Sequence, residues 1–203
     1  MMRQKLIVPI NSSPLQDPVL CTIASEIAPL SWISTENVFH DLMSCIIEQQ
    51  IHYRSSKKVF FHVMQSAGLK ELTTENFEIL EPALPTVKLS AAKYEAMART
   101  LDYFKQNSIN WHTLSDEEVR KALSVIPGIG RWTVDMILLF TLKRADIFPY
   151  DDYHLKKVMA AVYGLPDDSK REKKMIQIAE SWSGNRSIAV LYLLAWKNHQ
   201  LKR

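Results

Sequence analysis

The sequence predicts an all-α protein. Only five of the 203 residues are glycine, and the chain is rich in Leu, Ala, Ile, Met and Lys, residues that favour helices over sheet. Alternation of apolar and polar residues, the pattern of a half-buried strand, is not convincing beyond the first ten residues. With 47% hydrophobic residues, the chain can form one large domain or two small ones.

Start and stop signals divide the first half of the chain into helices. Asp17 as N-cap with Pro18 after it starts one helix, and Ser34 or Thr35 caps the next. Gly68 ends a third, because glycine readily adopts the left-handed conformation of a helix terminus. The predicted helices are 18–28, 36–50, 55–67, a short one within 74–80, and 91–105.

A helix, a glycine-rich turn and a second helix follow. Ser115 and Glu118 have the spacing of a capping box, which predicts a helix over 116–124. The stretch 127–130, Pro-Gly-Ile-Gly, then breaks the chain, and a second helix runs from Arg131 to about Lys143. The remaining predicted helices run from 153 to 163, from 170 to 181 and from 186 to 199.

This turn has the chemistry of an anion site. At the start of the second helix, the N–H groups of Gly128, Gly130 and Arg131 are expected to lack intrahelical acceptors, and the helix dipole adds positive potential there. Glycine also lets the backbone approach a DNA phosphate without an intervening side chain. An ordinary turn between two packed helices is the alternative, since such pairs commonly contain glycine.

Charge and cysteine content narrow the function classes. Residues 1–120 hold 11 Lys/Arg and 14 Asp/Glu, whereas residues 121–203 hold 14 and 8, so the half with the turn is positive. That distribution suits a surface that meets phosphates, although many of these residues can simply solvate helix faces. Two cysteines are too few for a four-cysteine zinc or iron–sulfur site.

The N-terminal residues lack the long apolar core of a signal peptide, and the apolar run 136–142 is too short to span a bilayer. We therefore expect a protein of the cytoplasm (the bacterial nucleoid) or the nucleus, without membrane association.

Two stretches in the second half carry a resemblance to a known family. Residues 126–133, IPGIGRWT, followed by 148–153, FPYDDY, are similar to the helix-hairpin-helix DNA glycosylase superfamily, and most similar to its 3-methyladenine DNA glycosylase II branch. The resemblance implies two helical subdomains with an active-site cleft between them. Residues 36–142 would form a central helical barrel containing the hairpin at 116–143, and residues 1–35 with 143–203 would form the second subdomain.

The implied activity is that of a monofunctional DNA-3-methyladenine glycosylase. Such an enzyme flips an alkylated purine out of duplex DNA, hydrolyses its N-glycosidic bond and leaves an abasic site. Asp152 is the expected catalytic residue, because a carboxylate stabilises the sugar cation that develops as the base departs. The choice of Asp152 over Asp151 rests on the resemblance, and either residue could serve only as a helix cap.

The resemblance also implies a base pocket formed by Trp132, Tyr153 and Met136. Trp132 occupies the position where strand-nicking members of the superfamily carry a lysine nucleophile, so a lyase step is not expected. Its electron-rich ring could attract a cationic base through a cation–π contact. The alternative is a tryptophan that only packs in the core.

Further contacts are implied at three places. Gln49 and Gln50 match the segment that fills the gap left by the extruded base, with a polar helix end as the alternative. Arg131 and Arg186 are candidate phosphate contacts, or surface salt-bridge partners. A structural K⁺ or Na⁺ is implied at the hairpin; no cofactor is required, and no iron–sulfur cluster is expected. The carbonyl oxygens that would bind the ion are those of Ser124, Ile126 and Ile129.

The expected partner is double-stranded DNA containing alkylated bases, and the expected state is a monomer. Two other functions stay open. One is a DNA-binding module that recognises damage or structure without cutting, and the other is a glycosylase of the same fold for a different damaged base.

Overall fold

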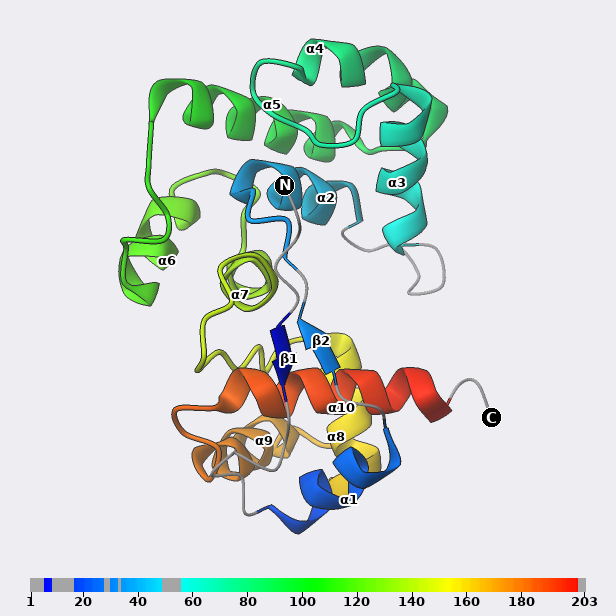
Figure 1. The fold of residues 1–203 in the computed structure, drawn as a ribbon, viewed down its shortest axis with the longest axis vertical. Coiled ribbons are helices and arrows are strands. Elements are labelled where there is room, and N and C mark those ends of the chain that lie inside the picture. Colours follow the sequence, from blue (N-terminus) through cyan, green and yellow to red (C-terminus); the bar gives the residue numbers. More distant parts are fainter. Residues whose placement is uncertain (1–5, 9–16, 28–29, 33, 49–55, 201–203) are drawn as a thin grey trace. The chain divides into compact units, whose positions relative to one another are not determined.

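The computed structural model describes residues 6–8, 17–27, 30–32, 34–48 and 56–200. The chain divides into two compact units, Thr35–Ile137 and Met1–Ser34 with Leu138–Arg203 (Figure 1). The sequence-based boundaries, after residues 35 and 142, lie one and five residues away from these. Almost all regular structure in the described residues is helical, which confirms the all-α class. No helix in those residues combines the length and apolar character needed to cross a bilayer.

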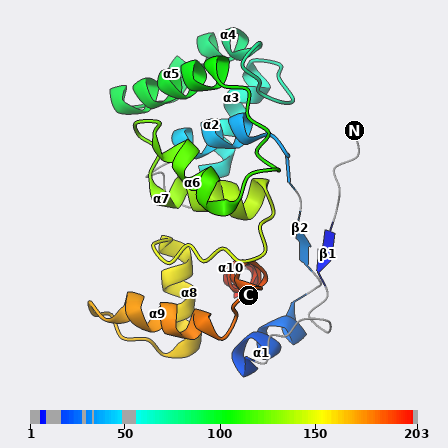
Figure 2. The ribbon, with the colours of Figure 1, turned by 90° about the vertical axis from the view of Figure 1, so that its left-hand side faces the viewer.

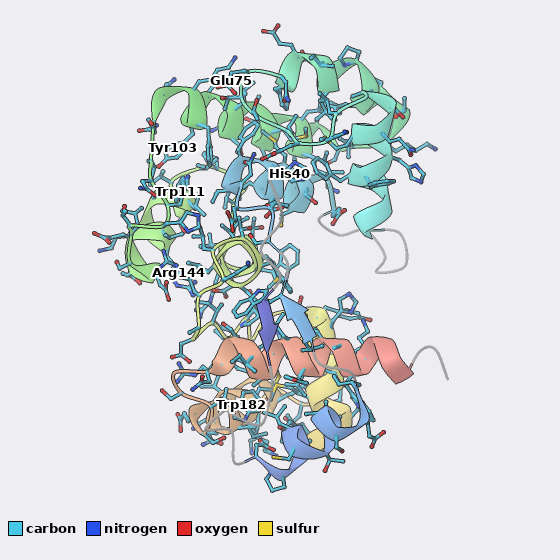
Figure 3. All side chains as sticks on the ribbon, in the orientation of Figure 1. His40, Glu75, Tyr103, Trp111, Arg144 and Trp182 are labelled. Carbon is cyan, nitrogen blue, oxygen red and sulfur yellow. The ribbon has the colours of Figure 1, made fainter. Side chains whose placement is uncertain are left out.

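The unit Thr35–Ile137 is built around α2, which packs against α3, α5 and α7. The apolar face of α2 is buried, and Leu42 and Ile46 have no exposed surface. An aromatic cluster continues this core: the Phe104 ring lies 5.4 Å from Phe39 and stacks on Trp111 at 5.5 Å (Trp111 is labelled in Figure 3). The elements of this unit are α2 (Val38–Glu48), α3 (Ser56–Ser66), α4 (Phe77–Leu80), η2 (Glu81–Thr86), α5 (Ala91–Gln106), α6 (Asp116–Ser124) and α7 (Arg131–Met136).

The start of α2 differs from the prediction. Asn37, rather than Ser34 or Thr35, caps this helix, because its Oδ1 accepts from the His40 N–H at 2.9 Å. The Ser34 hydroxyl instead donates to the Thr141 carbonyl, and Thr35 donates to the Asp41 carboxylate. The side chains of Ser34 and Thr35, the two predicted caps, are used in other hydrogen bonds, so the cap falls to Asn37.

The second unit is organised around α10, which packs against α8 and α1 (Figure 2 shows α10 end-on beside α8). Asp17 caps α1 as predicted, through bonds from the Val19 and Leu20 N–H groups to its Oδ1. Its Oδ2 accepts from the Tyr163 hydroxyl at 2.9 Å and the Trp182 indole at 3.0 Å, which ties α1 to the core. The elements are β1 (Leu6–Val8), α1 (Pro18–Glu26), β2 (Leu30–Trp32), η3 (Ile137–Thr141, whose first residue belongs to the other unit), α8 (Tyr153–Tyr163), α9 (Arg171–Glu180) and α10 (Arg186–Gln200).

Two details of the secondary structure were not predicted. β1 and β2 form a two-stranded antiparallel sheet in which Leu6 pairs with Trp32. The predicted helix 131–143 is α-helical only to Met136 and then widens into the π-helical η3. Lys143, with φ of +52°, lies beyond its end.

Candidate functional site

The helix-hairpin-helix forms as predicted, with α6 and α7 packed together in the unit Thr35–Ile137. The capping box at the start of α6 is complete: Ser115 Oγ accepts from the Glu118 N–H, and Glu118 Oε2 accepts from the Ser115 N–H at 2.7 Å. Gly130 caps α7 without a side chain, so the first N–H groups of α7 have no side-chain acceptor from the cap residue. That leaves the helix start suited to an anion.

The two glycines of the turn have different roles. Gly128 has φ of +93°, and a Cβ added there would lie 2.8 Å from the Cβ of Ala96 on α5. Gly130 has the extended φ of −89°, and a Cβ added there would meet nothing within 4 Å. Gly128 is therefore required by the fold, whereas Gly130 borders open space that a phosphate could approach.

A buried carboxylate joins the two helices of the hairpin. Asp135 on α7 has no exposed surface. Its Oδ1 lies 2.6 Å from Arg120 Nη1 on α6, and its Oδ2 lies 3.6 Å from Arg131 Nε on the first turn of α7. Asp135 thus pairs with Arg120, links α6 to α7, and also lies beside the Arg131 side chain that the sequence assigns to phosphate binding.

Asp135→Asn is expected to destabilise the protein by about 1–3 kcal/mol, because the amide no longer compensates the Arg120 charge and itself stays buried. Urea unfolding followed by circular dichroism measures this loss. Glu95→Gln is the matched control: it breaks a 2.5 Å pair with Arg99 whose side chains are 63% and 49% exposed. The control should cost less than about 0.5 kcal/mol. Equal losses for the two variants would contradict a structural role for Asp135.

Trp132 and Met136 lie one helical turn apart on α7. Trp132 is partly buried, and Met136 is 9% exposed. The Arg131 side chain is 54% exposed, so a surface partner can reach it. The base-pocket and phosphate-binding roles of these residues stay predictions.

Asp152 lies in the second unit, at the start of α8. It is the N-cap, and its Oδ1 accepts from the N–H groups of His154 at 2.9 Å and Leu155 at 2.7 Å. The residue is only 7% exposed. Capping therefore holds this carboxylate in one orientation, so the cap role and the predicted catalytic role are compatible.

Basic and aromatic side chains surround the start of α8. Tyr153 is 61% exposed, and the Lys157 ammonium lies 4.6 Å from the centre of its ring. His154 Nδ1 lies 2.5 Å from Lys197 Nζ on α10. Burial lowers the pKa of His154, and the neighbouring Lys197 lowers it further. The His154 ring and the Lys197 ammonium group are thus in contact next to Asp152, the carboxylate that caps α8.

Of the other residues predicted to contact DNA, Arg186 forms contacts within the protein, and the two glutamines lie outside the described residues. Arg186 pairs with Asp146 at 3.0 Å and donates from Nε to the Ala179 carbonyl, which is the salt-bridge alternative named above. Gln49 and Gln50 lie outside the described residues.

The donor chemistry at the turn fits a hard monovalent cation. The Ile126 carbonyl accepts one hydrogen bond, from the Ile129 N–H at 3.1 Å, and keeps a second lone pair. Ser124 ends α6, where helix carbonyls lack intrahelical partners. Within the described residues, no group of His, Cys, Asp and Glu side chains is arranged to bind a metal ion.

Three residues of this region were missed by sequence reasoning. Asp135 stands four residues after Arg131, a helical ion-pair spacing that could have indicated it. His154 and Lys197 are 43 residues apart, and no sequence pattern connects them.

Comparisons with known proteins identify related sequences. DNA-3-methyladenine glycosylase 1 of Schizosaccharomyces pombe is 30% identical over 172 residues, which cover 80% of this chain and 73% of that protein. The Bacillus subtilis protein YfjP is 28% identical over 192 residues, covering 88% of this chain and 65% of that protein. No family model matches.

The fold recurs in a solved structure. The S. pombe 3-methyladenine DNA glycosylase in complex with abasic DNA has a TM-score of 0.75 at 24% identity, covering 92% of this chain and 94% of that one. The fold and the glycine turn between α6 and α7 define a helix-hairpin-helix protein. The chain belongs to the DNA-3-methyladenine glycosylase family.

Proposed function

We propose that this protein hydrolyses the N-glycosidic bond of alkylated purines in duplex DNA and leaves an abasic site. The observation that carries the proposal is Asp152, a carboxylate that is 7% exposed and held by two backbone N–H groups at the start of α8. A structural cap alone would not require a charged residue, since asparagine caps as well as aspartate.

Asp152 would act on the sugar. As the bond between C1′ and the base nitrogen breaks, positive charge develops on the sugar ring, and a fixed carboxylate stabilises that charge. The same carboxylate can orient a water molecule and accept its proton as the water oxygen bonds to C1′. The two N–H groups on Oδ1 hold the carboxylate in place before the reaction, so little reorganisation is needed.

The leaving base sets the substrate class. A purine alkylated at N3 or N7 is already cationic and departs as a neutral molecule, so no protein acid has to protonate it. Trp132 and Tyr153 are the residues of this chain whose aromatic rings would favour such a base through cation–π attraction, and Met136, one turn beyond Trp132 on α7, would add apolar contact.

The hairpin would bind the DNA backbone. The open space at Gly130 and the exposed Arg131 side chain suit a phosphate, and the Gly128 and Gly130 amides would add hydrogen bonds. Gln49 and Gln50 would fill the space left by the flipped nucleotide, and Arg186 would add a phosphate contact. The carbonyls of Ser124, Ile126 and Ile129 would hold the K⁺ or Na⁺, whose charge would support a phosphate.

The direct test is to identify the released base. Duplexes that each contain one lesion are incubated with the protein, and the supernatant is analysed by mass spectrometry. Release of an alkylated purine, absent with undamaged duplex, is the expected result. Damage-specific binding without release from any lesion would instead assign a non-catalytic DNA-binding module.

The reaction is expected to stop at the abasic site. Trp132 cannot form the Schiff base that a lysine forms at this position, so strands should stay intact until alkali is added. Denaturing gel electrophoresis with and without alkali measures this difference. Strand breaks before alkali treatment, together with borohydride trapping of a protein–DNA adduct, would contradict it.

A further inference from the structure

Lys197 is the residue of α10 that reaches the start of α8. Its Nζ lies 2.5 Å from His154 Nδ1. His154 in turn donates its backbone N–H to Asp152 Oδ1, so the three residues are connected in order. All three belong to the same compact unit, and α8 and α10 pack against each other.

The contact defines the proton positions on His154. An ammonium group has donors only, so His154 Nδ1 must accept from Lys197, and the ring proton of neutral His154 is on Nε2. The imidazole is therefore held as one tautomer, and its orientation is fixed by a residue on another helix.

The Lys197 charge also acts on Asp152. Burial lowers the pKa of Lys197, and the Asp152 carboxylate opposes this shift. The charged groups that act on His154 are Lys197 from α10, Asp152 at the start of α8 and Lys157 on α8. Glu172 on α9 lies 3.7 Å from Lys156 on α8, so the Glu172 carboxylate pairs with Lys156.

We propose that Lys197 is a positioning residue of the glycosylase site: it holds the imidazole of His154 in one tautomer beside the buried Asp152 carboxylate. The inference rests on the proposed function of Asp152. Nothing in the turn or in the sequence around Asp152 indicates a role for residue 197, and the contact exists only because α10 folds back on α8.

The sign of the effect follows from the charges. An imidazole next to a cation takes up a proton at lower pH than one without it. Loss of the Lys197 charge should therefore let His154 become cationic at higher pH, where its charge would compensate that of Asp152. The acidic limb of the single-turnover rate of base release should then move to higher pH. Below that limb, release should fall about tenfold, whereas at high pH it should approach that of the wild type.

The experiment compares three variants. Lys197→Met keeps the apolar stem and removes the charge, and Lys197→Arg restores a permanent charge. Lys156→Met is the matched control, because it removes the same charge from α8 at a residue that faces Glu172. Circular dichroism verifies folding of each variant. Single-turnover release is then measured across pH at saturating protein concentration.

The expected result is a displaced acidic limb in Lys197→Met, its restoration in Lys197→Arg, and an unchanged limb in Lys156→Met. The proposal is overturned if Lys197→Met keeps the wild-type profile, if both Lys197 variants lose rate equally at every pH, or if Lys156→Met shifts the limb equally.

A second measurement does not depend on activity. In the folded protein, nuclear magnetic resonance follows the titration of His154, assigned through His154→Gln. Loss of the Lys197 charge in Lys197→Met should raise the pKa of His154, and an unchanged titration would overturn the coupling. If that pKa rises but the wild type releases no base from any lesion, the coupling stands and the proposed function has failed.

Discussion

Asp152→Asn is expected to lower base release by about a hundredfold to a thousandfold or more, while DNA binding persists. The charge that stabilises the sugar cation is lost, and removal of one preorganised electrostatic group at a reacting centre typically has an effect of this size. The variant should fold, because the asparagine Oδ1 can accept from the same His154 and Leu155 N–H groups.

Single-turnover release and a binding titration, run on the same damaged duplex, separate the two effects. Asp151→Asn is the neighbouring control: it makes the same chemical change one residue earlier and should keep most of the activity. Release by Asp152→Asn at the wild-type rate, or loss confined to Asp151→Asn, would remove Asp152 from the mechanism.

Gly128→Ala is expected to lower stability by about 1–3 kcal/mol, because its Cβ would overlap Ala96 and because φ of +93° disfavours any side chain. Gly130→Ala should leave stability nearly unchanged, since φ there is −89° and the added Cβ meets open space. The same open space is where a phosphate would approach, so Gly130→Ala should weaken DNA binding instead.

Urea unfolding and fluorescence anisotropy with labelled duplex distinguish these outcomes. The two alanine substitutions are chemically identical and two residues apart, so each controls the other. If Gly130→Ala binds DNA as the wild type does, the turn does not meet the backbone at Gly130. If Gly128→Ala is as stable as the wild type, α5 can move to make room for the added methyl group, and glycine is not required at this position.

Much of the fold was predictable because its helix boundaries are encoded locally. Ser115 and Glu118 form a complete capping box, and Asp17 with Pro18 starts α1 as expected. The failures occur where distant contacts compete with local preference. Ser34 donates to Thr141 and so does not cap α2, and β2 exists because β1 supplies a partner strand.

The site was predictable to a smaller extent. The turn and the helix start at Asp152 were predicted because their residues are contiguous in the sequence, whereas the catalytic role of Asp152 rests on the family resemblance and stays a prediction. Asp135 was missed, although its spacing from Arg131 is visible in the sequence, because burial is what gives that ion pair its importance.

The sequence by itself determined the helices, the glycine turn and the identity of the acid at position 152, because each depends on residues within a few positions of one another. Only the tertiary structure decided that Gly128 is required by Ala96 of α5 and that Lys197 of α10 meets His154 beside that acid. Those contacts depend on how helices pack, and packing is set by side chains far apart in the chain.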